Sequence, residues 1–194
     1  MKLQEIELKI KDEDEDGVFA ISLVESPAIE ENFVALSTEK VELKVVDDER
    51  RIVVGFALVP EKRIYRRMNG KEFNIYFTKE TVNQAQELFM KKLNLKNWTL
   101  EHEQKTDGIS VIESWIVEDP KNDKANLYNL DPQGGEWVVM SKIYNDAVWK
   151  DVKEGRFKGY SIEAMFSGFE QLASKDESEA EETLRKLREL LSEK

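Results

Sequence analysis

The chain has 194 residues with no cysteine and a single histidine, and its formal net charge at pH 7 is −11. The missing cysteines exclude disulfides and thiolate chemistry, and one histidine excludes a multi-histidine metal site within one chain. The negative charge argues against nucleic acid as the main partner, because phosphate binding needs clustered positive charge. No apolar run approaches the roughly 20 residues of a membrane helix, so we expect no membrane partner. We also expect a cytoplasmic protein without a cofactor.

The N-terminal quarter of the chain has the patterns of extended structure. Residues 3–10 alternate between apolar and polar side chains, which predicts a strand, and the acidic run at 11–17 predicts a turn. Residues 18–29 are expected to be extended and then broken at Pro27, because the residue before proline disfavours the helical region. We interpret residues 1–48 as an N-terminal arm or a separate strand pair.

From residue 51 onward the patterns indicate a β-rich core. The apolar run at 51–60 predicts a buried strand, and Gly55 within it predicts a bulge or a close backbone approach. Two β-rich runs flank Asn69 and Gly70, a dipeptide typical of a type I′ hairpin turn. Further strands are predicted at residues 97–103, 109–119, 136–144 and 160–169.

Helices are predicted between these strands and at the end of the chain. Thr78 is a suitable N-cap for a helix over residues 78–93, and Asn145 is a suitable N-cap for a shorter helix over 146–153. The highly charged segment 175–194 predicts a terminal helix. Its narrow leucine stripe is sufficient to dock on a partner but not to fold alone.

The fold class that these elements predict is mostly β (α+β). Short strands, tight turns and the lack of alternating βαβ units favour an antiparallel β-barrel-like core with inserted helices and a charged C-terminal helix. We divide the chain into an N-terminal arm (1–48), a core (49–170) and a charged helical tail (171–194).

Two residues are candidates for nucleophilic catalysis. A serine is a poor nucleophile unless a base takes its proton, and histidine is the usual base. His102, in WTLEHE, is the only histidine, and Ser161 lies in GRFKGYSIEAMF. Both interrupt apolar strands near their ends and both have acidic neighbours. The residues alone leave a second interpretation open, in which His102 is a half-exposed strand residue and Ser161 fills a tight position beside Gly159.

The order of several motifs resembles that of the prohead maturation proteases of tailed bacteriophages, specifically the XkdF-like branch. The histidine strand is followed by ESWIVEDP, then by G-x-W, then by KGYSIE, and the resemblance spans residues 21–169. Such proteases are similar in fold to herpesvirus assemblins, which have a small β-barrel and a serine–histidine centre. The resemblance implies that Ser161 is the nucleophile and His102 the general base of a serine endopeptidase.

The resemblance also implies a biological role. It predicts an enzyme that cleaves phage scaffold and major capsid proteins, and itself, in the host cytoplasm inside the assembling prohead, with self-association as a further expectation. The alternative is a catalytically silent virion or scaffold protein that keeps the protease fold for assembly. A nucleic-acid module is disfavoured by the charge of the chain.

The third member of the catalytic centre is left open by the sequence. A triad needs a group that orients the histidine; assemblins use a second histidine, so here we predict an acidic residue. Glu113 is the first choice, because its strand is expected to form a hairpin with the histidine strand. Glu118 and Asp119 are alternatives, since a one-residue register slip reverses the face of a strand. Glu163, two residues after the serine on the same strand face, could instead crowd the site with negative charge.

Two arginine positions are candidates for binding negative charge. Arg156 is a candidate donor to the oxyanion that forms during acyl transfer. Arg66, together with Arg67, is a candidate for binding an acidic substrate side chain. The alternative for this pair is a solvated hairpin edge that positive charge protects from further strand pairing.

Overall fold

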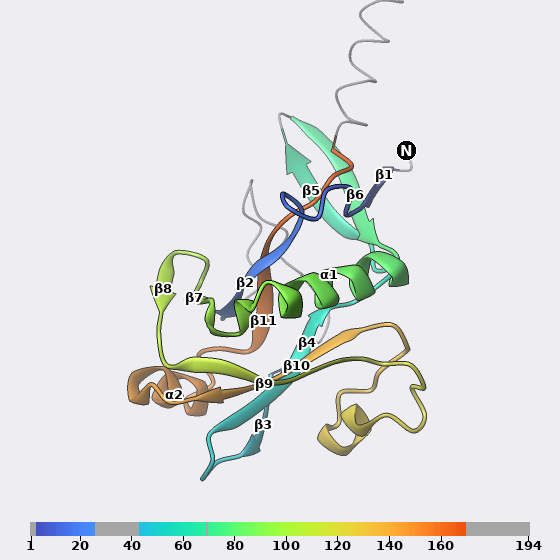
Figure 1. Ribbon diagram of the computed structural model, residues 1–194. Coiled ribbons are helices and arrows are strands. Elements are labelled where there is room, and N and C mark those ends of the chain that lie inside the picture. Colours follow the sequence, from blue (N-terminus) through green and yellow to red (C-terminus); the bar gives the residue numbers. More distant parts are fainter. Residues whose placement is uncertain (1–2, 26–42, 69, 170–194) are drawn as a thin grey trace, which may run out of the picture.

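The structure, a computed structural model, describes residues 3–25, 43–68 and 70–169 (Figure 1). These residues form three β-sheets and two α-helices, which confirms the mostly-β α+β class. The predicted barrel is wrong for this part of the chain, because the strands form separate sheets of three, four and four strands and no closed ring of pairing. The charged helix predicted over 175–194 lies outside the described residues.

The first sheet, which carries the candidate serine, has the strand order β11-β2-β7-β8. Its strands are β11 (Gly159–Met165), β2 (Gly17–Val24), β7 (Trp98–Leu100) and β8 (Gln104–Thr106). β2 is central and pairs antiparallel with β11 and parallel with β7. The sheet therefore brings together three segments that are far apart in the sequence.

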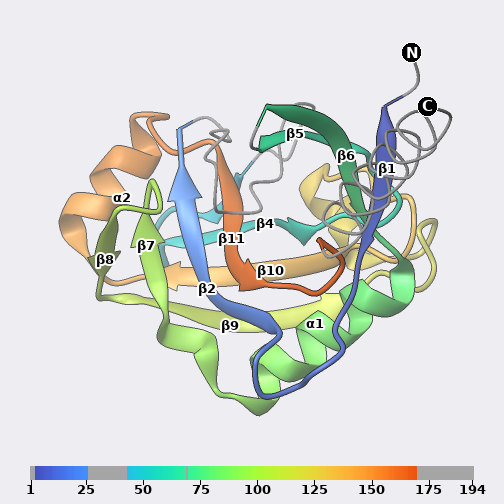
Figure 2. The same ribbon diagram turned by 90° about the horizontal axis from the view of Figure 1, so that it is seen from above.

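The second sheet has the order β3-β4-β10-β9. Its strands are β3 (Lys44–Asp47), β4 (Ile52–Leu58), β10 (Trp137–Ile143) and β9 (Ile109–Ile116). Figure 2 shows these strands running across the direction of β2, β7 and β11. Two sheets that pack in this crossed manner bury their facing side chains between them.

The third sheet has the order β1-β6-β5. Its pairing separates strands that a barrel would join. β5 (Ile64–Met68) and β6 (Lys71–Phe77) form the predicted hairpin, whereas β1 (Gln4–Leu8) pairs parallel with β6 and not with β2. β1 and β2 thus belong to different sheets. Both β1 and β2 supply fully buried core residues, such as Ile6 and Leu23, and the division of the chain into arm, core and tail stays a prediction.

The two helices begin at the predicted caps. Thr78 accepts a hydrogen bond from the Thr81 backbone N–H (3.2 Å), and Asn145 accepts from the N–H groups of Ala147 (3.0 Å) and Val148 (3.2 Å). No helix of the described ranges is long and apolar enough to cross a membrane. The helical elements are α1 (Lys79–Lys91) and α2 (Asp146–Lys153), with short 3-10 helices η1 (Asn94–Lys96) and η2 (Lys124–Tyr128).

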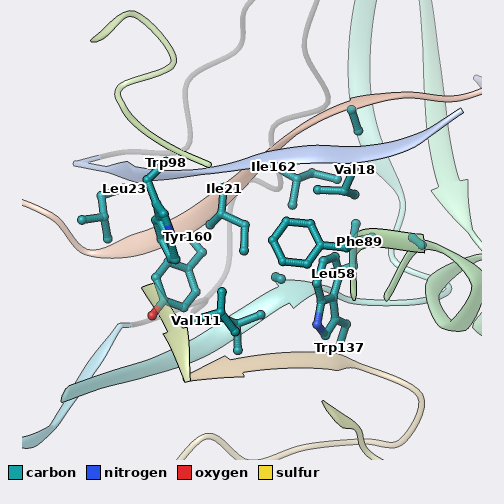
Figure 3. Close-up of a cluster of buried hydrophobic side chains, with 14 of the residues drawn as sticks. Val18, Ile21, Leu23, Leu58, Phe89, Trp98, Val111, Trp137, Tyr160 and Ile162 are labelled. Atoms are coloured by element: carbon teal, nitrogen blue, oxygen red, sulfur yellow. The ribbon is translucent and has the colours of Figure 1, made fainter. Parts of the chain in front are cut away.

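The main hydrophobic core contains side chains from all three sheets and from both α-helices. Figure 3 shows Tyr160 and Ile162 pointing from β11 into this cluster. The ring centroids of Trp98 and Tyr160 are 5.6 Å apart. The predicted close approach at Gly55 is confirmed, since a Cβ there would lie 3.2 Å from Cδ2 of Tyr160. The glycine allows β11 to pack closely on β4, and it fixes the strand that carries Ser161.

Candidate active site

The alternation of side chains along β11 places Ser161 on the face opposite to the core. Tyr160 and Ile162 point into the core, so Ser161 and Glu163 share the other face, as a two-residue period requires. Ser161 is nevertheless fully buried, and its Oγ makes no hydrogen bond with any residue in the described ranges. Buried hydroxyls normally have a partner, so an unpaired serine oxygen is typical of a functional position.

His102 lies in the turn between β7 and β8, not on a strand. Glu101 and His102 have φ values of 52° and 60°, and the Glu103 N–H donates to the Leu100 carbonyl over 3.1 Å, as in a type I′ turn. The expectation of a half-exposed strand residue is therefore wrong, and only 2% of the His102 side chain is exposed. Non-glycine residues at positive φ carry strain, which is common at functional sites.

This turn is attached to β2 through two backbone hydrogen bonds. The Glu101 N–H donates to the Leu23 carbonyl (3.0 Å), and the His102 N–H donates to Oγ of Ser22 (3.0 Å). Ser22 lies directly opposite Ser161 in the register of β2 and β11. Cross-strand partners project to the same face of a sheet. The turn therefore holds His102 on the face of the sheet that carries Ser161.

The imidazole of His102 lies beside Glu163. Nδ1 of His102 is 3.5 Å from Oε1 of Glu163, and the same carboxylate oxygen accepts a short hydrogen bond from Oγ1 of Thr99. Thr99 pairs with Ser22 in the parallel register of β7 and β2. The register and these contacts thus assign five polar side chains to the same face of the first sheet. They are Ser161 and Glu163 from β11, Ser22 from β2, Thr99 from β7 and His102 from the following turn.

Glu113 does not lie in this cluster. It is exposed on β9 and forms an ion pair with Lys124, whose Nζ lies 4.0 Å from the centre of the Trp115 ring. The expected hairpin between the strands of His102 and Glu113 is wrong, because β7 pairs with β8 and β9 pairs with β10. The chain leaves the first sheet at Gly108, where φ is 78°, and β9 joins the second sheet.

The two alternative acids are also remote from the histidine turn. Glu118 and Asp119 are exposed in the segment that follows β9. A hydrogen bond from the Asn122 side chain, followed by one from the Lys121 backbone, lowers the pKa of Asp119. These contacts give Asp119 a structural role in a surface turn, and neither acid contacts the imidazole.

The two arginine positions lie outside the cluster as well. Arg156 is half-exposed before β11, and its guanidinium binds the carboxylates of Glu25 (2.6 Å) and Asp151 (3.3 Å). Arg66 is on β5, in the third sheet, where its Nη1 donates to the Tyr65 carbonyl over 2.7 Å. Arg66 is buried, and burial lowers its pKa to about 10, whereas Arg67 is exposed on the same edge strand. An oxyanion or substrate role of either residue stays a prediction.

A β-sheet with a buried serine, a histidine and a carboxylate on one face has the residue types of a serine hydrolase. The protein family described as "Putative phage serine protease XkdF" matches residues 40–170. The chain therefore belongs to this family of phage serine proteases. Comparison with curated proteins gave no match, and neither did comparison with solved structures, so the expected likeness to herpesvirus assemblins stays a prediction.

Sequence reasoning missed two members of the cluster, although a signal was present for both. Ser22 is the polar residue within AISLV and Thr99 the polar residue within WTL, both inside apolar strands. A polar residue in such a strand marks the face that does not join the core. The pattern could not show that β2, β7 and β11 belong to one sheet and carry these residues on the same face.

Proposed function

We propose that the chain is a serine endopeptidase of phage head assembly, with Ser161 as the nucleophile and His102 as the general base. One observation carries the assignment. The turn that holds the only histidine is hydrogen-bonded to Ser22, the residue directly opposite Ser161. Two residues distant in sequence thus share one sheet face, in a chain that belongs to a phage serine protease family.

The reaction that these groups support is acyl transfer. Oγ of Ser161 attacks the carbonyl carbon of a peptide bond while His102 accepts the hydroxyl proton. When the tetrahedral intermediate collapses, the C–N bond breaks and His102 gives the proton to the leaving amine. Water then attacks the ester of the acyl-enzyme with His102 again as the base, which releases the carboxylic acid and restores the serine.

The substrates of the proposal are the scaffold and major capsid proteins of the phage, together with the chain itself. The site of action is the assembling prohead in the host cytoplasm, and self-association there is part of the proposal. Membership of a phage protease family supports this role. The likeness in fold to the herpesvirus assemblins is a further part of the proposal.

One observation favours a second candidate function. Ser161 is fully buried and only 2% of the His102 side chain is exposed, so a peptide reaches the serine only after the site opens. Such a closed site also fits a catalytically silent virion or scaffold protein that keeps the protease fold. The two candidates differ in whether Ser161 can be acylated or phosphonylated at all.

The deciding experiment is labelling with a small fluorophosphonate, which reacts only with activated serines, followed by peptide mapping. The variants are Ser161→Ala, His102→Asn and the control Ser110→Ala on β9. Asparagine tolerates positive φ, so His102→Asn preserves the turn while it removes the base. We expect labelling of Ser161 in the wild type and the control, and a loss of about 10²-fold or more in His102→Asn. Equal labelling of wild type and His102→Asn, or no labelling of Ser161, would overturn the proposal.

A further inference from the structure

We infer that Glu163 is the positioning residue of His102, held in place by Thr99; its catalytic meaning rests on the proposed function. The carboxylate would accept a hydrogen bond from Nδ1–H of His102. This arrangement leaves Nε2 of the ring unprotonated and able to accept the serine proton. The sequence left this role to Glu113 or its neighbours, none of which contacts the ring.

The contacts around Oε1 of Glu163 carry the inference. This one oxygen lies 3.5 Å from Nδ1 of His102 and accepts the hydroxyl hydrogen of Thr99. The exposed fractions of the Glu163 and His102 side chains are only 11% and 2%. Little water competes in such a place, so a carboxylate has a strong influence on a neighbouring imidazole. Thr99 fixes the carboxylate from the adjacent part of the sheet and restricts its rotamers.

The assignment also follows from the sheet register. Glu163 lies two residues after Ser161 on β11, so both side chains project to one face. His102 approaches this face through its hydrogen bond to Ser22. The ring thus lies beside Glu163, while the backbone of the same residue is attached to Ser22, the cross-strand partner of Ser161. The concern that Glu163 crowds the serine with charge is answered by its two contacts, which direct the carboxylate toward Thr99 and His102.

Other charged groups of this region have different partners, and one of them supplies a matched control. Glu101 precedes His102 in the same turn, but its Oε1 accepts the backbone N–H of Glu25 over 2.5 Å. The Glu25 carboxylate in turn binds Nε of Arg156. Glu101→Gln therefore removes one negative charge beside His102 without changing the group that contacts Nδ1.

The experiment uses the fact that His102 is the only histidine of the chain. Protein labelled with ¹⁵N at histidine, and purified through a tag without histidine, gives ring signals from His102 alone. Two-bond proton–nitrogen correlations at about pH 8, above the ordinary histidine range, show which nitrogen carries the proton. We expect the Nδ1–H tautomer in the wild type and in Glu101→Gln. In Glu163→Gln we expect the Nε2–H form that histidine prefers in water, because a glutamine amide can donate to Nδ1.

Two further measurements keep the inference falsifiable. Thr99→Val keeps the shape of Thr99 and removes its hydroxyl, so we expect a mixture of His102 tautomers in this variant. It tests the inference independently if Glu163→Gln does not fold. The rate of fluorophosphonate labelling should fall by about 10²-fold or more in Glu163→Gln and stay near the wild-type value in Glu101→Gln.

The Nε2–H tautomer in the wild type, or the Nδ1–H tautomer in both Glu163→Gln and Thr99→Val, would overturn the inference. These outcomes are distinct from a failure of the proposed function. A protein whose His102 is fixed as Nδ1–H by Glu163, but whose Ser161 never reacts, would confirm the positioning contact and reject the protease.

Discussion

The backbone N–H of His102 donates a hydrogen bond to Oγ of Ser22 over 3.0 Å. Because Ser22 pairs with Ser161, this single contact links the turn after β7 to the strand that carries the serine. The position of the His102 backbone is thus set by this hydrogen bond and by the sheet register.

Replacing Ser22 with alanine should loosen this link. The variant leaves the N–H of His102 without its acceptor, and we expect a loss of about 1 kcal/mol in the free energy of unfolding. The labelling rate of Ser161 should fall more than this stability loss explains, because the strained turn is released. Ser110→Ala, on β9, is the control. An unchanged labelling rate in Ser22→Ala would show that the turn holds its position without this hydrogen bond.

Adding a methyl group at Gly55 should separate the first two sheets. A Cβ at this position would lie 3.2 Å from Cδ2 and 3.3 Å from Cε2 of Tyr160. Overpacking of this kind costs roughly 1–3 kcal/mol, so chemical denaturation of Gly55→Ala should show a loss in that range. Combining it with Tyr160→Leu should give a smaller total loss than the sum of the single variants. Additive losses would mean that the ring is not the group that the methyl meets.

Removal of the Tyr160 hydroxyl should also be costly. It lies 2.6 Å from Oγ of Ser141 and 3.4 Å from the Val53 carbonyl, and both serine and tyrosine are buried. Tyr160→Phe leaves the serine hydroxyl without this partner, so we expect a loss of about 1–3 kcal/mol. In the double variant with Ser141→Ala most of that loss should disappear. A double variant that is no more stable than Tyr160→Phe would argue against the pair.

The same tyrosine should make stability depend on pH in the alkaline range. Burial raises the pKa of Tyr160 above its ordinary value, while the hydrogen bond with Ser141 acts in the opposite direction. Above about pH 10 the unfolded tyrosine loses its proton and the folded one keeps it. The free energy of unfolding should therefore fall as the pH rises beyond about 10, and less steeply in Tyr160→Phe. Urea titrations from about pH 8 to 11 measure the two slopes, and equal slopes would contradict the assignment.

Much of the fold could be predicted from local patterns. The helices α1 and α2, their caps at Thr78 and Asn145, and the hairpin around Gly70 all depend on neighbouring residues, and all are confirmed. Sheet membership depends on contacts between distant segments. No periodicity shows that β1 pairs with β6 while β2 pairs with β7 and β11, and this pairing replaces the expected barrel with separate sheets.

The candidate site was predictable to a similar extent. His102 could be named because it is the only histidine of the chain, and Ser161 because the motif around it resembles a family. The acidic residue beside the imidazole could not be named, because the choice between Glu113 and the other acids required knowledge of which strand pairs with β9. Since β9 pairs with β10, Glu113 lies in the second sheet, and Glu163 occupies the position beside the ring.

The most direct test of the proposed function is cleavage of the natural substrates. The wild-type chain, Ser161→Ala and Ser110→Ala are each incubated with the scaffold and major capsid proteins of the same phage, and fragments are identified by mass spectrometry. The protease assignment predicts defined fragments of these proteins, and of the chain itself, with the wild type and Ser110→Ala, and none with Ser161→Ala. Identical fragments with and without the Ser161 hydroxyl, or intact proteins in every reaction, would contradict it.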